Sequence, residues 1–164
     1  AGYSIGSLIE NDLMLSINDG YDQLVATGLA TSGTISGGTL DVLTNTRKAI
    51  TAAQAAGYAP DTLIIDAAGA EAIDLFRSSG TEKLFAFGAG RFAPGQLFGL
   101  NVRVSKTAGT AVVDSAAFGK LYASPLTLAR FEQDAGSTNQ STVRLEGHAA
   151  FGVERTGAAV RVMP

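Results

Sequence analysis

One serine, two aspartates and the only histidine have the residue types of a hydrolytic site. Residues 2–6, Gly-Tyr-Ser-Ile-Gly, match the G-x-S-x-G motif that holds a serine nucleophile between a strand and a helix. Asp66 or Asp114 and then His148 follow Ser4 in the chain order of an α/β hydrolase. Only Ala1 precedes the motif, so the strand that it requires is missing, and we expect no catalytic triad.

Asp66 also suggests chemistry by its position after the apolar run Leu63, Ile64 and Ile65. Strand ends open onto the crevice of α/β sheets, where enzymes often hold a catalytic acid. Aspartate is equally a leading N-cap residue, because its carboxylate accepts backbone N–H bonds from the first helical turn. We favour the cap and keep the catalytic acid as the alternative.

Residues 88–93, Gly-Ala-Gly-Arg-Phe-Ala, match the G-x-G-x-x-A pattern of a pyrophosphate-binding turn. The motif needs a helix directly after it, and Pro94 with Gly95 prevents one from starting. We therefore interpret 81–95 as a long irregular loop with aromatic anchors.

His148 has no identified Ser, Cys or metal partner, so we interpret it as a surface or interface residue.

The composition excludes several classes of protein. The 164 residues include no Cys and one His, which removes disulfides, thiolate metal sites and His-rich metal sites. The net charge of -3 disfavours a dedicated nucleic-acid or anionic-membrane surface, and no apolar run is long enough to span a bilayer. Only 16% of residues are charged, against about 25% in ordinary domains, which favours a protein that covers much of its surface with neighbours.

The apolar periodicity predicts an α+β chain. A helix over 7–25 would begin with a Ser7–Glu10 capping box, and the small residues of 27–38 form a junction. Thr39 would cap a second helix that Gly57 stops, and Asp66 would cap a third that ends at 78–80. The predicted strands are 63–65, 97–105, 111–114, 120–124, 126–131, 143–154 and 158–163, with a polar turn at 132–141.

Four segments in succession resemble the tailed-phage major capsid proteins of the Hong Kong ninety-seven type. DVLTNTRKAITAAQAAGYAPDTLIIDAAGAEAIDLFR is similar to the family's helix, apolar strand and second helix. LFGLNVRVS and VVDSAAFGKLY resemble the strands that follow, and VRLEGHAAFGVERTGAAVRV resembles the terminal strands. Asn101 stands where the family usually has Pro.

The resemblance implies the fold and its parts. Residues 1–38 would hold the end of the peripheral domain's spine helix and a Gly-rich junction, 39–130 the axial domain with helices on a mixed sheet, and 131–164 terminal strands that return to the peripheral domain. The family's N-terminal arm and extended loop have no counterpart here and are expected upstream of Ala1. The chain is therefore expected to be a carboxyl-terminal portion of a subunit.

The predicted function is structural: a major capsid subunit that assembles into pentamers and hexamers of an icosahedral shell around double-stranded DNA. Implied partners are copies of itself and scaffold, protease and portal proteins, without sequence-specific nucleic acid or membrane, in the virion and, during assembly, the host cytoplasm. We predict no catalytic, cofactor-binding or metal site. The alternatives are a hydrolase-like enzyme using Ser4, Asp66 or His148, a nanocompartment shell protein, and a host-binding or decoration module.

Overall fold

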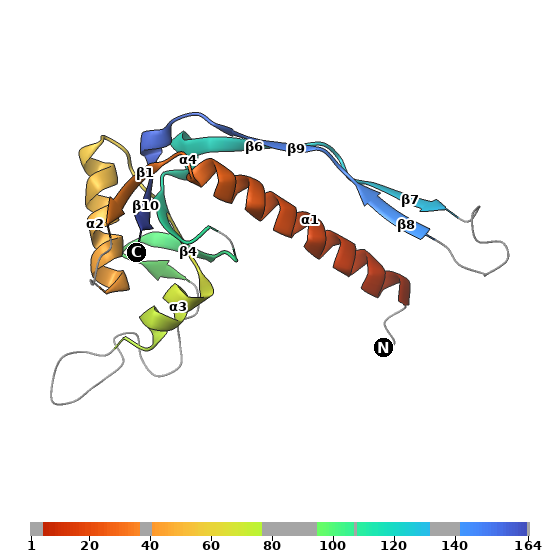
Figure 1. Cartoon of the computed structure of the whole chain (residues 1–164), viewed down its shortest axis with the longest axis horizontal. Helices are drawn as coiled ribbons and strands as arrows, with labels where there is room; N and C mark the ends of the chain where they lie inside the picture. Colours follow the sequence, from red (N-terminus) through yellow and green to blue (C-terminus); the bar gives the residue numbers. More distant parts are fainter. Residues whose placement is uncertain (1–4, 37–40, 77–94, 107, 132–141, 164) are drawn as a thin grey trace.

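A computed structural model describes residues 5–36, 41–76, 95–106, 108–131 and 142–163. Figure 1 shows two parts: a sheet flanked by short helices, and a long helix that leaves it alongside a β-ribbon. The helices are α1 (Ile5–Leu29), α2 (Val42–Ala55), α3 (Ala67–Asp74), α4 (Ser115–Phe118) and the 3-10 turn η2 (Thr156–Ala158). The strands are β1 (Gly33–Ser36), β2 (Thr62–Ile65), β3 (Gln96–Leu97), β4 (Leu100–Val104), β5 (Thr110–Val113), β6 (Gly119–Ala123), β7 (Thr127–Phe131), β8 (Thr142–Glu146), β9 (Ala149–Val153) and β10 (Ala159–Met163).

The sheet unit consists of six strands in the order β1-β10-β5-β2-β4-β3, with α2, α3 and α4. The β1–β10 and β2–β4 pairs are parallel, and the other pairs are antiparallel, so the predicted mixed sheet is confirmed. The strands β1 and β10 come from opposite ends of the chain and join the same sheet as β2, β4 and β5. The division at 38/39 and 130/131 into axial and peripheral domains stays a prediction.

Helix α2 begins and ends on local signals. The N-cap is Asp41, whose Oδ1 accepts a hydrogen bond from Thr44 N at 2.8 Å. The sequence-based choice of Thr39 is wrong, because the helix starts at Val42, two residues later than that cap allows. The predicted stop is confirmed: Gly57 has a φ of 85°, a conformation that glycine adopts without the steric cost of a Cβ.

The predicted strand and cap at 63–66 are confirmed. Leu63 and Ile65 on β2 are fully buried, and β2 lies between β5 and β4 in the sheet. Asp66 is the N-cap of α3, and its Oδ1 accepts a hydrogen bond from Gly69 N at 2.7 Å. Helix α3 ends at Asp74, short of the predicted end at 78–80.

Two apolar clusters cover the two faces of the sheet. The first packs α2 and α3 on one face through Ala49, Ile50, Ala53 and Ile73. The second covers the other face with the end of α1, through Leu29, and with Phe118 of α4. Most of the buried apolar side chains of the described chain belong to these clusters, so the core lies in the sheet unit.

Two predicted strands are each split in two. The segment 97–105 contains a two-residue turn at Phe98 and Gly99, both with positive φ, which folds β3 back onto β4. The segment 143–154 is interrupted at Gly147 and His148, which separate β8 from β9. The loop predicted at 81–95, apart from Gly95, and the turn predicted at 132–141 lie outside the described residues.

Helix α1 is longer than predicted. It begins at Ile5 and runs to Leu29, so Ser7 lies within the helix and cannot form the predicted capping box. Within the segment 27–38, α1 ends at Leu29 and β1 follows at Gly33–Ser36. The junction between lobes at this segment stays a prediction. No other part of the chain packs closely against Gly20, because a Cβ added at this position would have no atom within 4 Å.

Candidate functional site

The residues suspected of hydrolysis are not brought together in the described part of the chain. Ser4 and the motif at 88–93 lie outside it. The carboxylate of Asp66 serves as the α3 cap, and Asp114 caps α4, accepting from Ala117 N at 3.2 Å. Neither aspartate lines the grooves that contain His148.

The described residues contain no cluster of three side chains that could bind a metal ion. They also contain no helix that is long and apolar enough to cross a membrane.

Asp61 and Asp114 join the start of β2 to α4. Asp61 accepts hydrogen bonds from the backbone N and the Oγ of Ser115, and Asp114 Oδ2 accepts one from Ala59 N at 3.1 Å. Partial burial acts to raise the pKa of Asp61, but the hydrogen bonds from Ser115 outweigh it, so this pKa lies below its ordinary value. Both carboxylates therefore hold loops in place, as structural acids do.

The remaining strands form a narrow two-stranded ribbon that runs beside α1. Antiparallel β6 and β9 make its near half, and antiparallel β7 and β8 make its far half. We call α1 together with β6, β7, β8 and β9 the projection; Figure 1 shows it extending away from the sheet unit.

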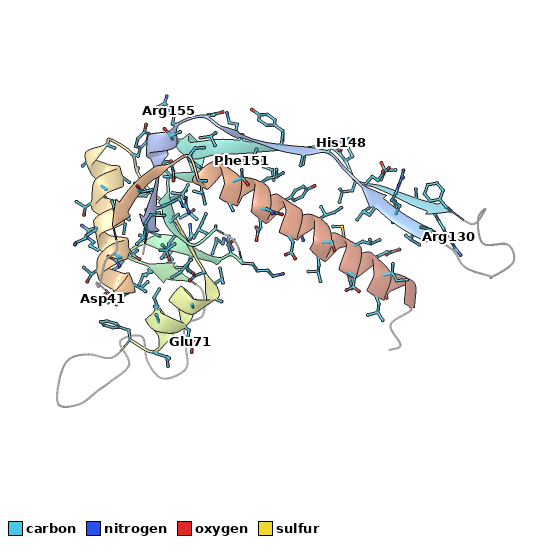
Figure 2. All side chains as sticks on the ribbon, in the orientation of Figure 1. Asp41, Glu71, Arg130, His148, Phe151 and Arg155 are labelled. Carbon is cyan, nitrogen blue, oxygen red and sulfur yellow. The ribbon has the colours of Figure 1, made fainter. Side chains whose placement is uncertain are left out.

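The projection is attached to the sheet unit at one end. The rings of Phe118 and Phe151 pack in a tilted arrangement with centroids 5.7 Å apart, and a Cβ on Gly28 of α1 would lie 2.5 Å from Phe151 Cδ1. Figure 2 shows Phe151 where the ribbon meets the end of α1. The missing side chain at Gly28 therefore lets α1 dock closely on the ribbon at this point.

His148 lies at the break between the two halves of the ribbon. Its backbone N donates to Ser124 Oγ at 2.9 Å, and Ser124 N donates to the His148 carbonyl at 2.8 Å. The Ser124 hydroxyl thus takes the place of a backbone carbonyl as the acceptor for His148 N between the two strands. The break places His148 between β8 and β9, and Arg144 and Glu146 of β8 form an ion pair with each other at 2.8 Å.

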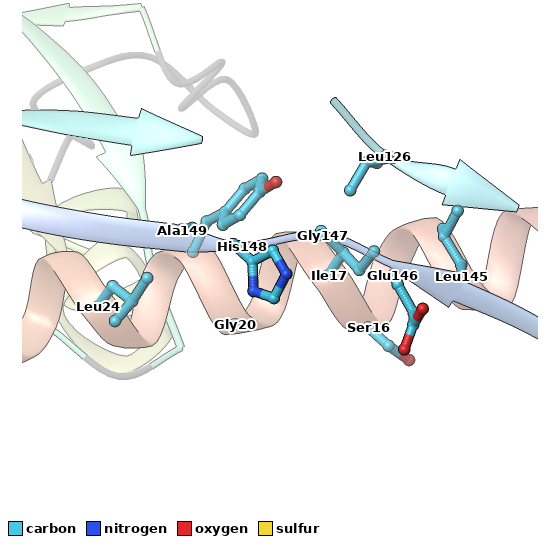
Figure 3. Close-up of a pocket in the computed structure, with 11 residues that line it drawn as sticks. Ser16, Ile17, Gly20, Leu24, Leu126, Leu145, Glu146, Gly147, His148 and Ala149 are labelled. Carbon is cyan, nitrogen blue, oxygen red and sulfur yellow. The ribbon is translucent and has the colours of Figure 1, made fainter. Parts of the chain in front are cut away.

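A shallow groove of about 450 Å³ separates α1 from the ribbon at this level. Its apolar walls are Ile17, Tyr21 and Leu24 from α1, and Leu126 and Leu145 from the ribbon. Figure 3 shows the His148 ring on the groove side of the ribbon, over the middle of α1. The arrangement offers mainly apolar contact, with few polar groups that converge on one point.

The projection exposes large apolar side chains beyond this groove. Among the described residues, twelve large apolar side chains are more than 40% exposed, and eight belong to the projection. The eight side chains are Leu8, Ile9, Met14 and Leu15 of α1 and Leu121, Tyr122, Leu128 and Phe131 of the ribbon.

Such a surface is typical of a chain that buries apolar area against other chains. The low fraction of charged residues is visible in the sequence, but it does not show that apolar residues remain exposed on α1 and the ribbon. The signal was the apolar pairs Leu8-Ile9 and Met14-Leu15, which extend around α1 beyond the width of one buried stripe.

No protein-family model matches the sequence, and no curated protein matches it. Solved structures do match the fold. The structure titled as the capsid of an empty GTA particle aligns with a TM-score of 0.61 and 15% identity, over 79% of this chain and 48% of that chain. A structure from Mycobacterium phage Ogopogo aligns with a TM-score of 0.61 and 19% identity, over 82% of this chain and 54% of that chain.

The chain has the fold of a phage capsid protein. This confirms the predicted α+β phage capsid fold and the resemblance on which it rested, at the level of fold. The chain spans about half the length of the solved chains that it matches.

Proposed function

We propose that this chain is part of a tailed-phage major capsid subunit that packs with copies of itself into pentamers and hexamers of a shell enclosing double-stranded DNA. The observation that carries the proposal is the fold shared with the GTA particle capsid over 79% of this chain. In this proposal the virion is the final location, and scaffold, protease and portal proteins are partners during assembly in the host cytoplasm.

The exposed surface of the projection supports a role in assembly. Monomeric proteins rarely expose eight large apolar side chains on one projecting part, whereas a shell subunit buries such side chains against its neighbours. Closed rings need heterologous contacts, in which two different surfaces of the same chain meet. An elongated chain with surfaces on separate elements is suited to such contacts.

We assign the sheet unit to the axial domain and the projection to the peripheral domain. The proposal rests on strand pairing: β1 and β10 complete the sheet with β5, while β6 to β9 pair only with one another among the described strands. Under this assignment the terminal segment 131–164 contributes to both domains.

We propose that the chain has no catalytic function. The support is geometric, because the carboxylates of Asp66 and Asp114 hold backbone N–H groups and lie outside the groove of His148. Purified chain and its Ser4→Ala variant are expected to hydrolyse generic esters equally slowly, at the background rate. Activity that disappears only in the Ser4→Ala variant would contradict the structural role.

Electron microscopy of the natural gene product that contains this chain tests the proposal. Expression should give closed shells with five-fold and six-fold capsomers, in which the sheet unit and the projection fit the density. Nuclease-protected double-stranded DNA inside the native particles separates a capsid from a protein-filled nanocompartment. Soluble particles that never exceed a few subunits, under conditions where the product is folded, would refute the proposal.

A further inference from the structure

The ribbon is interrupted between its near half, β6 and β9, and its far half, β7 and β8. The near half ends at the pair Ala123–Ala149. The far half begins at the pair Thr127–Glu146, so three residues of one strand lie opposite two of the other. Such a mismatch is a β-bulge, which bends a strand and increases its twist. Figure 1 shows the ribbon changing direction between β6 and β7. We call residues 124–126 and 147–148 the joint.

A serine side chain takes part in holding the joint. Ser124 N donates to the His148 carbonyl at 2.8 Å, and His148 N donates to Ser124 Oγ at 2.9 Å. Pro125 has no N–H group, so it cannot donate a hydrogen bond to the opposite strand. Gly147 makes room for Leu126, because a Cβ on this glycine would lie 2.6 Å from Leu126 Cδ2. The regular backbone ladder is therefore broken at the joint.

The extra residue at the joint also decides which side chains of the far half face α1. In the near half, Leu121 lies opposite Phe151, which packs against α1 at Gly28, so odd-numbered residues of β6 face the helix. Beyond the joint the alternation is shifted by one residue. Leu128 lies opposite Leu145, which lines the groove beside α1. Without the extra residue, Leu128 would face away from α1.

The apolar side chains that face each other across this groove do not cover one another. Leu128 is 50% exposed although it lies on the α1 side of the ribbon. Ile17 and Tyr21 line the opposite wall, and the groove between the walls has a volume of about 450 Å³. Gly20 lies in that wall, and a Cβ added there would have no atom within 4 Å. Closure of the groove would remove apolar surface of both walls from water, which is favourable.

The two halves of the ribbon differ in how they are held. Phe151 of the near half packs against Phe118, which is buried in the second core cluster. Glu154 N, directly after β9, donates to the Phe118 carbonyl at 2.8 Å. In the far half, every residue of β7 and β8 is exposed or half-buried. The near half is thus fixed to the sheet unit, whereas the far half can move without exposing a buried residue of its own.

We propose that the joint is a hinge, about which the far half of the ribbon swings as a flap that closes the groove onto α1. The described structure is the open position, which the hydrogen bond from His148 N to Ser124 Oγ helps to hold. In the closed position, Leu128 and Leu145 pack on Ile17 and Tyr21. In a shell, the motion lets one chain meet its neighbours at the different angles of pentamers and hexamers, a use that rests on the proposed function.

Distances between two nitroxide labels, measured by double electron–electron resonance, test the hinge. The chain contains no cysteine, so labels attach only where cysteines are introduced. The far pair joins Leu15→Cys on α1 to Thr142→Cys on β8, about 13 Å along the strand from the joint. The near pair joins Leu15→Cys to Tyr122→Cys on β6. All three positions are exposed.

We expect two distances for the far pair, an open one and a shorter closed one, and a single narrow distance for the near pair. Both measurements are made on the free chain in frozen solution. A far pair as narrow as the near pair would show that the ribbon is rigid at the joint and would overturn the inference.

Two substitutions should shift the far pair in opposite directions. Ser124→Ala removes the acceptor for His148 N and should raise the ratio of closed to open chains about threefold. Ile17→Trp fills the groove and should remove the shorter distance. Thr127→Ala, which removes an exposed hydroxyl next to the joint, is the matched control and should change neither distance.

The near pair should keep its distance in all three variants, and circular dichroism checks that each variant is folded. The hinge would be refuted if Ser124→Ala and Ile17→Trp both left the far pair unchanged. It would also be refuted if the near pair shifted as much as the far pair, because the movement would then lie outside the joint.

The outcome is separable from that of the proposed function. Closed shells from the natural gene product, together with a rigid joint, would refute the hinge and leave the capsid role in place. A flap with two positions in a protein that never forms shells would uphold the hinge and refute the capsid role.

Discussion

The sheet unit and the projection treat similar apolar residues in opposite ways. Leu63 and Ile65 on β2 have no exposed surface, whereas Leu15 on α1 and Tyr122 on β6 are 62% and 61% exposed. The sheet unit has a buried apolar cluster on each face of the sheet. The projection is one helix beside a ribbon two strands wide, which cannot bury both sides of either element. We infer that the sheet unit supplies the stability of the free chain and that the projection supplies contact surface for neighbours.

The largest expected difference lies in truncating leucines. Leu63→Ala should lower the free energy of unfolding by about 2–5 kcal/mol, because it leaves a cavity in a fully buried cluster. Leu15→Ala should change it by less than about 0.5 kcal/mol, because the side chain is already in water. Urea denaturation of both variants measures the contrast, and equal losses would erase the distinction between the two parts.

Two glycines of α1 make the same comparison within one helix. Gly28→Ala should cost about 1–3 kcal/mol, because the new Cβ would fall 2.5 Å from Phe151 Cδ1 and push α1 off the ribbon. Gly20→Ala should instead stabilise by up to about 1 kcal/mol, since nothing lies within 4 Å of the added Cβ and alanine favours the helix. Thermal unfolding followed at 222 nm reports both effects. A stabilising Gly28→Ala would disprove the close docking.

The Asp66 cap should have a moderate effect on the sheet unit. Asp66→Ala removes the acceptor for Gly69 N and should cost about 0.5–2 kcal/mol, while Asp66→Ser keeps an acceptor and should cost much less. Denaturation midpoints of the two variants give the measurement. If neither substitution moved the midpoint, the cap would not contribute to stability.

The smallest expected effect depends on pH. The pKa of Asp61 is lower in the folded chain than its ordinary value, so the ionised carboxylate stabilises the fold above the unfolded pKa, and this contribution is lost as pH falls through the folded pKa. Asp61→Asn should therefore cost about 1 kcal/mol at neutral pH, reduced by solvent screening, and less in acid. Urea midpoints at pH 7 and near pH 3 test this. If the destabilisation by Asp61→Asn were larger near pH 3 than at pH 7, the pKa of Asp61 would not be lowered in the folded chain.

Sequence reasoning predicted the parts of the fold that depend on local signals. The α2 stop at Gly57, the strand at 63–65 and the Asp66 cap each rest on a few adjacent residues, and all three are confirmed. Thr39 was a wrong choice of cap because threonine and aspartate both cap helices well, and only the hydrogen bond that Thr44 N donates to Asp41 identifies the cap.

The rest of the fold depends on pairing between distant residues. The turn at Phe98 and Gly99 was missed because phenylalanine is unusual at positive φ and the segment alternates like one strand. The addition of β1 and β10 to the sheet joins residues more than 120 positions apart, which no local pattern reveals. The exposed surface of the projection was also missed, because periodicity predicts which side chains face a core but not whether a core is present.

Amide hydrogen exchange of the free chain and of the assembled shell tests the central claim most directly. If neighbours cover the projection, amides of residues 8–22 and of β7 and β8 should exchange fast in the free chain and be protected in the shell. Amides of β2, β5 and β10 should be equally protected in both states, because the sheet unit is complete without neighbours. Projection amides that exchange at the same rate in both states would contradict the account.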